Sequence, residues 1–388
     1  MNNKDIIILS TAEWTNPFWT NKQHVAVALE KMGYRVFYID SLGLRRPSVS
    51  SQDFNRIFKR LKIALRPPKE VKNNIWVWSP IILPFQNISW VRSFNRLLFG
   101  LWLGFWLKRK GFQRDLLWTY NPLTTRILNV NKFGNLIYHC VDEIKAQPGM
   151  PVQLLEEAES DLIVLSSVIF TTAKQLYETR RNLNENTFYL SNVADYNHFQ
   201  KALLNETVVP NDLNVIPKPI AGFIGALSGY KVDFQLIKQA AIENPEVSFV
   251  LIGKIGEGDP WSDVSSLKEM KNIYFLGPKK YEELPAYLKG FDLAMLPNTL
   301  NEYTDSMFPM KFFEYLAAGS PVVSVDLKSL SDFHDVCFLS ESYKDFSKNI
   351  RLALNDTTEQ IEKRVGLAKE YTYDSRMEKM MEIVGEQL

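Results

Sequence analysis

Residues 308–323 read FPMKFFEYLAAGSPVV and contain, in order, a loop, a helix, a helix stop and a strand. Apolar side chains recur in this run at helical spacing, at Phe312, Phe313, Leu316 and Ala317. Pro309 suits the first helical position, where its missing N–H costs nothing. Gly319 can end the helix, and Pro321 prevents its continuation. The next residues, 322–325, predict a short buried strand.

The first turn of this predicted helix carries charges that an ordinary surface helix does not need. Lys311 lies at the positive end of the helix dipole, where a cation is disfavoured. The same helix terminus, with its free N–H groups, favours a bound anion. Glu314 follows one turn later, within reach of a nucleotide whose diphosphate rests on that terminus. A plain amphipathic helix with a Gly-Ser-Pro exit explains the helix and the strand, but it gives no role to these two charges.

The run resembles the donor-binding signature of glycosyltransferases with the GT-B fold, most closely family 4 and its relatives. That signature, Pro-x-Lys-x-x-Glu-Tyr-x-Ala-x-Gly-x-Pro-Val-Val, matches residues 309–323 without a gap. The resemblance implies an α/β protein with two Rossmann-like domains facing a cleft and a C-terminal helix that crosses back to the first domain. It also implies a nucleotide-diphosphate sugar as substrate, bound at Phe308, Pro309, Met310, Lys311 and Glu314.

Length and composition fit this reading. A chain of 388 residues suggests two domains of ordinary size. An apolar content of 46% and a charged content of 23% are typical of soluble globular proteins. Cys140 and Cys337 are the only cysteines, which is too few for a disulfide framework and fits a reducing cytosol. The first residues run directly into a strand, so no secretion signal is expected.

The order of predicted elements gives the domain organisation. Residues 5–40 read as strand, helix, glycine and strand, a βαβ unit that opens a Rossmann-like sheet. The Gly-x-Gly-x-x-Gly fingerprint is missing after the first strand, so an NAD- or FAD-binding domain is not expected. The expected divisions are an acceptor-binding domain, a linker, a donor domain and a returning C-terminal helix, at residues 1–205, 206–219, 220–370 and 371–388.

Further donor-site candidates follow the predicted strands of the second domain. Gly225 would let backbone N–H groups approach a phosphate or a sugar. Ser228 lies in the same turn, and Lys254 follows the next strand. Tyr281 lies in a loop after a third strand, and the resemblance implies that this loop lines the base pocket. Glycine turns after strands are common, so these positions are weak signals by themselves.

Two carboxylates follow the predicted strand that begins at Leu136. Asp142 and Glu143 lie at its carboxyl end, where function gathers in open parallel sheets. A cap or turn carboxylate is the ordinary interpretation of such residues. The resemblance extends to membrane-associated inverting sugar transferases of polysaccharide assembly, and it implies that Asp142 is the general base, with Glu143 in reserve. His139 is expected to be a strand residue rather than the base.

Charge is distributed unevenly along the chain. Residues 1–130 hold 20 Lys and Arg, 7 Asp and Glu, and eight of the nine Trp. This composition favours an anionic membrane surface, since no nucleic-acid-binding signature is found. Residues 45–72 are read either as an interfacial helix on anionic lipid or as a solvated surface helix. The run of eleven from Leu97 to Leu107 is too short to span a bilayer, and a buried helix is preferred over a membrane-dipping one.

The sequence predicts sugar transfer without a metal or another cofactor. No Asp-x-Asp motif occurs, and four His and two Cys are too scattered for a zinc site. Lys311, the helix terminus and turn amides would therefore meet the diphosphate charge. Retaining relatives carry Glu-x₇-Glu, but Ser306 stands at the first position here, so inversion is slightly favoured while both outcomes stay open.

Three functions remain. The first is a hexosyltransferase-type enzyme that builds a surface polysaccharide on a lipid-linked acceptor, cytoplasmic and peripheral on the inner face of the cell membrane. The second is a nucleotide-sugar epimerase of the same fold class, which would leave the basic, Trp-rich half without a purpose. The third is a non-catalytic module that keeps the donor pocket. The donor sugar, its base and the acceptor depend on pocket shape.

Overall fold

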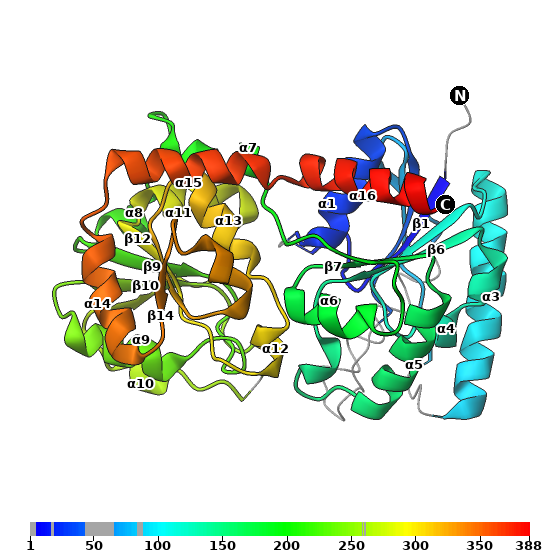
Figure 1. Cartoon of the computed structure of the whole chain (residues 1–388), viewed down its shortest axis with the longest axis horizontal. Coiled ribbons are helices and arrows are strands. Elements are labelled where there is room, and N and C mark those ends of the chain that lie inside the picture. The colour runs from blue at the N-terminus through cyan, green and yellow to red at the C-terminus, as the bar shows by residue number, and fades with distance from the viewer. Residues whose placement is uncertain (1–4, 17–18, 43–65, 84–87, 258, 260) are drawn as a thin grey trace. The chain divides into compact units, whose positions relative to one another are not determined.

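The computed structural model describes residues 5–16, 19–42, 66–83, 88–257, 259 and 261–388. The chain divides into two compact units (Figure 1). Unit 1 comprises Met1–Leu190 and Met377–Leu388, and unit 2 comprises Ser191–Arg376. Element labels follow Figure 1. The predicted α/β class with two Rossmann-like sheets is confirmed.

Unit 1 is built on an eight-stranded sheet in the order β3-β4-β2-β1-β5-β6-β7-β8. Every pairing is parallel except β3 with β4. The central strands are continuous apolar runs because both faces of the sheet are covered. The strands are β1 Asp5–Leu9, β2 Arg35–Ile39, β3 Lys69–Lys72, β4 Ile75–Trp78, β5 Leu116–Thr119, β6 Asn135–Cys140, β7 Val168–Thr171 and β8 Thr187–Tyr189.

Two helical layers cover this sheet. Helices α1 and α16 share one apolar core with the sheet, and α3, α4, α5 and α6 share the other. Met377, Met380 and Val384 of α16 lie in the first of these cores. The helices are α1 Asn21–Lys31, α3 Ser89–Lys110, α4 Thr124–Ile127, α5 Val152–Leu165, α6 Lys174–Arg181 and α16 Tyr373–Gln387, with short 3₁₀ turns at Val130–Lys132 and Ile144–Ala146.

Unit 2 contains a six-stranded, wholly parallel sheet in the order β11-β10-β9-β12-β13-β14. This is the doubly wound order, with its switch point between β9 and β12, and ligands bind at the carboxyl ends of strands beside such a point. The strands are β9 Ile220–Ile224, β10 Ser248–Ile252, β11 Ile273–Phe275, β12 Leu293–Leu296, β13 Val322–Val325 and β14 Phe338–Ser340.

Helices flank both faces of the second sheet (Figure 1). Helix α9 contacts α10 and α14 on one side, while α13 contacts α7 and α15 on the other. The helices are α7 Tyr196–Phe199, α8 Asn211–Asn214, α9 Phe234–Glu243, α10 Ser265–Lys268, α11 Leu284–Gly290, α12 Glu302–Asp305, α13 Met310–Ala317, α14 Tyr343–Ala353 and α15 Thr358–Glu370. The 3₁₀ helices are η3 Gln200–Leu203, η4 Tyr281–Glu283 and η5 Lys328–Phe333.

Several segments differ from the sequence-based expectation. Residues 191–205 belong to unit 2, and the expected linker at 206–219 contains α8 with a fully buried Leu213. Helix α5 ends at Leu165, and Leu162 and Ile163 belong to its buried face. Pro309 is the N-cap residue of α13, one position before the helix begins. Most of the basic segment 45–72 lies outside the described residues, and its end forms the exposed strand β3.

Close packing at Gly222 gives a first prediction. A Cβ at this position in β9 would lie 2.1 Å from the ring of Phe291. We expect Gly222→Ala to lower the stability of unit 2 by about 1–3 kcal/mol, because the buried ring has to move. Calorimetric melting would measure the loss.

Gly366→Ala is the matched control. A Cβ there meets no atom within 4 Å, and the residue lies in α15. This change should stabilise the protein by roughly 0.5–1 kcal/mol, since alanine favours the helix. Equal melting of wild type and Gly222→Ala would show that Phe291 does not constrain the strand.

Candidate active site

Three glycine turns meet backbone to backbone at the carboxyl edge of the second sheet. Gly225, Gly253 and Gly277 follow β9, β10 and β11, respectively. The amide of Gly225 donates to Ile252 O at 2.9 Å, and the amide of Gly253 donates to Gly277 O at 3.1 Å. A Cβ on Gly253, where φ is +152°, would lie 1.7 Å from the carbonyl oxygen of Gly225. Only glycine therefore permits this contact.

The predicted residues of the first two turns lie together at this edge. Leu227 donates its amide to Lys254 O at 3.0 Å, which joins the turn after β9 to the turn after β10. Ser228 is buried, and its hydroxyl donates to the carbonyl of Glu257. Lys254 is exposed. Gly225 and Lys254 thus lie at one edge, whereas the Ser228 hydroxyl already holds the turn together.

Helix α13 is fixed to the same edge by a side chain of its own. The hydroxyl of Tyr315 accepts the amide hydrogen of Ile224, at 3.0 Å, one residue before Gly225. Burial raises the pKa of Tyr315, so the hydroxyl stays protonated. Tyr315 belongs to the signature, but sequence reasoning assigned it no role. Its position ties the helix that carries Lys311 to the turn that carries Gly225.

The residues before α13 are held equally firmly. The ring of Phe308 stacks on Phe313, with centroids 5.3 Å apart and planes at 4°. The side-chain amide of Asn192 donates to Phe308 O at 2.6 Å. Pro309 is buried at the N-cap, and Met310 is the first helical residue. These contacts fix the direction in which the first N–H groups of α13 point.

Lys311 and Glu314 form an ion pair on the first turn of α13. Lys311 Nζ lies 2.7 Å from Glu314 Oε2, and the two side chains are 29% and 5% exposed. Burial raises the pKa of Glu314 above its ordinary value, while Lys311 and His198 oppose that rise. The lysine is the more exposed member of the pair, so an anion can contact it while the carboxylate stays buried.

Tyr281 lies in a cluster that sequence reasoning did not assemble. Its ring stacks on His198, with centroids 4.3 Å apart and planes at 11°, and meets Phe199 edge-on. His198 Nε2 donates to the carbonyl of Tyr281 at 2.8 Å. Burial raises the pKa of Tyr281, and the charges of Glu314 and Asp195 raise it further. His198 precedes Tyr281 by 83 residues, so local spacing in the sequence could not bring the two together.

In unit 1, the two carboxylates after β6 have different environments. Glu143 is buried and makes two bonds to the guanidinium of Arg180, at 2.8 and 3.0 Å. Arg180 also binds Glu159, and Tyr138 donates to Glu159 at 2.7 Å. Asp142 is half-buried beside this network. A buried carboxylate held by two bonds to arginine is suited to structure rather than proton transfer, which leaves Asp142 as the better candidate base.

His139 has the structural position expected for it. It is fully buried in β6, and its Nδ1 lies 3.2 Å from the hydroxyl of Tyr120. Within the described residues, no group of three or more His, Cys, Asp or Glu is placed to hold a metal ion. In that same part of the chain, no helix has both the length and the apolar character needed to cross a membrane.

A known protein family matches most of unit 2. Residues 218–356 match the family described as glycosyl transferases group 1, and this range holds all the glycine turns and α13. That part of the chain is similar to group 1 glycosyl transferases.

One relative matches a longer part of the chain. A teichuronic acid biosynthesis glycosyltransferase, TuaH of Bacillus subtilis (strain 168), is 28% identical over 235 residues. The match covers 56% of this chain and 57% of that protein. The chain therefore spans little more than half the length of this relative.

Solved structures give the fold of the whole chain. Sucrose-phosphate synthase from Thermosynechococcus elongatus superposes with a TM-score of 0.69 at 14% identity and covers 99% of both chains. Anabaena HepE, solved in complex with UDP-glucose, gives a TM-score of 0.67 at 14% identity and covers 98% of this chain and 99% of its own. The chain has the GT-B fold.

The ion pair between Lys311 and Glu314 gives a pH prediction. In Lys311→Met the buried Glu314 loses its counter-ion, so its pKa should rise further above the ordinary 4.5. A folded carboxyl with a raised pKa binds more protons than the unfolded one, so stability falls as pH rises from about 4.5 through the folded pKa. We expect this variant to lose about 1–3 kcal/mol relative to wild type at pH 8, and much less below pH 4.5.

Melting temperatures across this pH range measure the effect. Adding Glu314→Gln to Lys311→Met removes the titrating group, and the pH dependence of the difference should disappear. A loss that is the same at every pH would show that Lys311 acts through packing rather than through the charge of Glu314.

Proposed function

We propose that this chain is a glycosyltransferase that moves a sugar from a nucleotide-diphosphate sugar to a hydroxyl of a lipid-linked glycan. The observation that carries the proposal is the Lys311–Glu314 pair on α13, held beside the glycine turns in the segment that matches group 1 glycosyl transferases. The teichuronic acid relative supports a place in surface polysaccharide synthesis. The complex of HepE with UDP-glucose supports a nucleotide sugar as donor.

Each proposed role follows from the chemistry of the residue. Lys311 and the first N–H groups of α13 stabilise negative charge as it develops on the leaving diphosphate, and electrostatic stabilisation of this kind usually contributes most to catalysis. Glu314 accepts hydrogen bonds from the ribose hydroxyls. Gly225 lets turn amides approach the phosphates, Lys254 adds a positive charge, and Tyr281 lines the base pocket. Asp142 removes the proton of the acceptor hydroxyl if the reaction inverts the anomeric carbon.

The proposal includes a location and a metal requirement. The enzyme works at the cytoplasmic face of the membrane, because its acceptor is a lipid and residues 1–130 are rich in Lys, Arg and Trp. It uses no divalent metal, because Lys311 and the helix terminus supply the positive charge that a metal would otherwise bring.

Donor binding is the first test. Thermal stabilisation is measured with a panel of nucleoside diphosphates and nucleotide sugars, and again after addition of EDTA. A ligand at 100 times its dissociation constant adds about 2.7 kcal/mol, which a melting curve resolves. We expect one base to stabilise wild type with or without EDTA, and to have little effect on Lys311→Ala.

Lys218→Ala is the control for that variant. Lys218 also pairs with a carboxylate, Asp292, at 3.0 Å, but it precedes β9 and so lies at the opposite end of this strand. Its substitution should leave donor binding intact. Equal binding by Lys311→Ala and wild type would contradict the proposed donor site, and stabilisation lost in EDTA would contradict metal independence.

Transfer is the second test. With the stabilising nucleotide sugar and a bacterial membrane lipid extract as acceptor, Asp142→Asn should lower sugar incorporation into lipid by about 10²–10⁴-fold. Its donor binding should not change. Glu143→Gln should instead lower the melting temperature, because the buried Arg180 loses one of its two carboxylate partners.

The alternatives give different results in the same assay. Full activity of Asp142→Asn would show that another group is the base. An epimerised nucleotide sugar without transfer would identify an epimerase. A donor that binds wild type but is never turned over with any acceptor would identify a non-catalytic module.

A further inference from the structure

Helix α3 has a second apolar face that its own unit does not cover. Phe99, Leu103 and Leu107 are buried in the core of unit 1. Seven other large apolar side chains on the helix are exposed, four of them by more than half of their surface. They are Trp90, Phe94, Leu97, Leu98, Leu101, Trp102 and Phe105. Their spacing of three and four residues places them in one continuous stripe, called here the α3 stripe.

A stripe of this size needs a partner. Single exposed apolar residues are common on proteins, but large contiguous apolar patches mark binding surfaces. The sequence of α3 contains five basic residues and no acidic one. Its charge therefore suits an anionic partner rather than a neutral or basic one.

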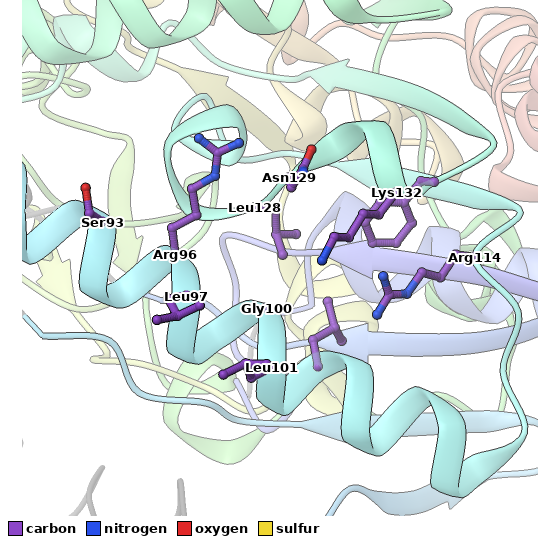
Figure 2. A pocket seen from close by; sticks show the side chains of 11 residues that line it. Ser93, Arg96, Leu97, Gly100, Leu101, Arg114, Leu128, Asn129 and Lys132 are labelled. Atoms are coloured by element: carbon purple, nitrogen blue, oxygen red, sulfur yellow. The ribbon is translucent and has the colours of Figure 1, made fainter.

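A cationic groove adjoins the stripe. It has a volume of about 330 Å³ and lies between α3 and the residues around Arg114 and Leu128–Phe133 (Figure 2). Leu97 and Leu101 belong both to the stripe and to the groove lining. Among the described residues, three cations line the groove, Arg96, Arg114 and Lys132, and no carboxylate does.

The cations of the groove are not neutralised within the part of the chain that the structure describes. Arg96, Arg114 and Lys132 make no ion pair there, in contrast to Lys311 or Arg180. The guanidinium of Arg114 lies over the ring of Phe133, and one of its nitrogens is 2.8 Å from where a Cβ of Gly104 would be. Figure 2 shows the ends of Arg114 and Lys132 in the same space beside α3.

Gly100 keeps this space open. A Cβ at Gly100 would meet no atom within 4 Å, and the residue lines the groove. Gly100 therefore has no close neighbour, whereas a Cβ at Gly104 would meet the guanidinium of Arg114. A longer side chain at position 100 would enter the groove without disturbing the core.

We propose that the α3 stripe and its groove form a docking site for an anionic phospholipid membrane. The groove takes the phosphate of a lipid headgroup, and the stripe lies among the acyl chains next to it, with α3 in the plane of the interface. This proposal rests on the membrane association in the proposed function and assigns it to α3.

Two other partners fit the same surface less well. A second copy of this chain would bring two basic α3 faces together, and their like charges would repel. A nucleic acid would occupy the cations but leave seven large apolar side chains in water. A lipid surface offers both an anion and an apolar phase in one partner.

Vesicle co-sedimentation of the full chain tests the proposal. Vesicles of phosphatidylcholine mixed with phosphatidylglycerol are compared with vesicles of phosphatidylcholine alone. We expect wild type to bind the anionic vesicles, with weaker binding at high salt. Changing Arg96, Arg114 and Lys132 together to Gln should weaken binding roughly 100-fold, as removal of three surface-bound cations predicts. Changing Leu97, Leu101 and Phe105 to Gln should weaken it to a similar degree, about 100-fold.

Gly100→Leu separates shape from charge. It fills the groove, retains every cation and should reduce the preference for anionic vesicles. The control for the stripe changes Val152, Val164 and Leu165 of α5 to Gln, which are also exposed apolar residues of unit 1. The control for the cations changes Lys201, Lys268 and Lys271 to Gln, which are exposed in unit 2. Both controls should bind vesicles as wild type does.

Several outcomes would overturn the proposal. Equal vesicle binding by wild type and both α3 variants would place the membrane contact elsewhere. Absence of vesicle binding by wild type would remove membrane association altogether. Saturation of the groove by inorganic phosphate without vesicle binding would make it a site for free phosphate. A wild-type dimer that dissociates in the stripe variant would make α3 an interface between copies.

A measurement of donor binding distinguishes failure of the membrane proposal from failure of the transferase proposal. The same α3 variants should show unchanged thermal stabilisation by the donor nucleotide, since none of the changed residues lies in unit 2. Loss of vesicle binding with intact donor binding therefore concerns α3 alone. Failure of wild type to bind any donor concerns the transferase, whatever the vesicles show.

Discussion

The candidate donor site depends on a backbone contact that no side chain can replace. The carbonyl oxygen of Gly225 occupies the position of a Cβ on Gly253, at 1.7 Å. This contact brings the turns after β9 and β10 together, and the amide of Gly253 continues the series to Gly277. Tyr315 then connects α13 to the end of β9. The position of Lys311 relative to the glycine turns therefore follows from the packing of the turns and from the contact of Tyr315, and does not depend on the lysine side chain itself.

The same arrangement explains why much of unit 2 could be predicted from sequence. Apolar strands that alternate with helices along a chain usually form a parallel sheet whose two faces are covered by the helices. Local rules of periodicity and capping predict the helix, its end and the following strand within residues 308–325. The observed helix begins one residue later than predicted, because Pro309 is its N-cap. Local rules also place glycine after the strands. They do not say which glycine is needed for a turn and which, like Gly253, is needed for a contact between strands.

The partners of the site residues could not be predicted, because they come from distant segments. His198 stacks on Tyr281 across 83 residues, and Asn192 holds Phe308 across 116. Arg180 lies 37 residues after Glu143 in the sequence, and its bond to that carboxylate indicates a structural role for Glu143. Asp142 and Glu143 are equivalent in sequence, since both follow the same strand. Burial and a guanidinium distinguish them, and neither is visible in local spacing.

The exposed face of helix α3 could not be predicted from the sequence pattern either. Its apolar residues are too numerous for one buried face, so the sequence allowed either a buried helix or one that dips into a membrane. The structure assigns the residues to two faces: Phe99, Leu103 and Leu107 fill the core, and the α3 stripe remains outside. The buried face supplies the residues of α3 that belong to the core of unit 1. Exposed apolar surface of this extent favours association of some kind. The basic residues of α3 and the cations of the groove favour an anionic partner, since like charges would repel another copy of the same face.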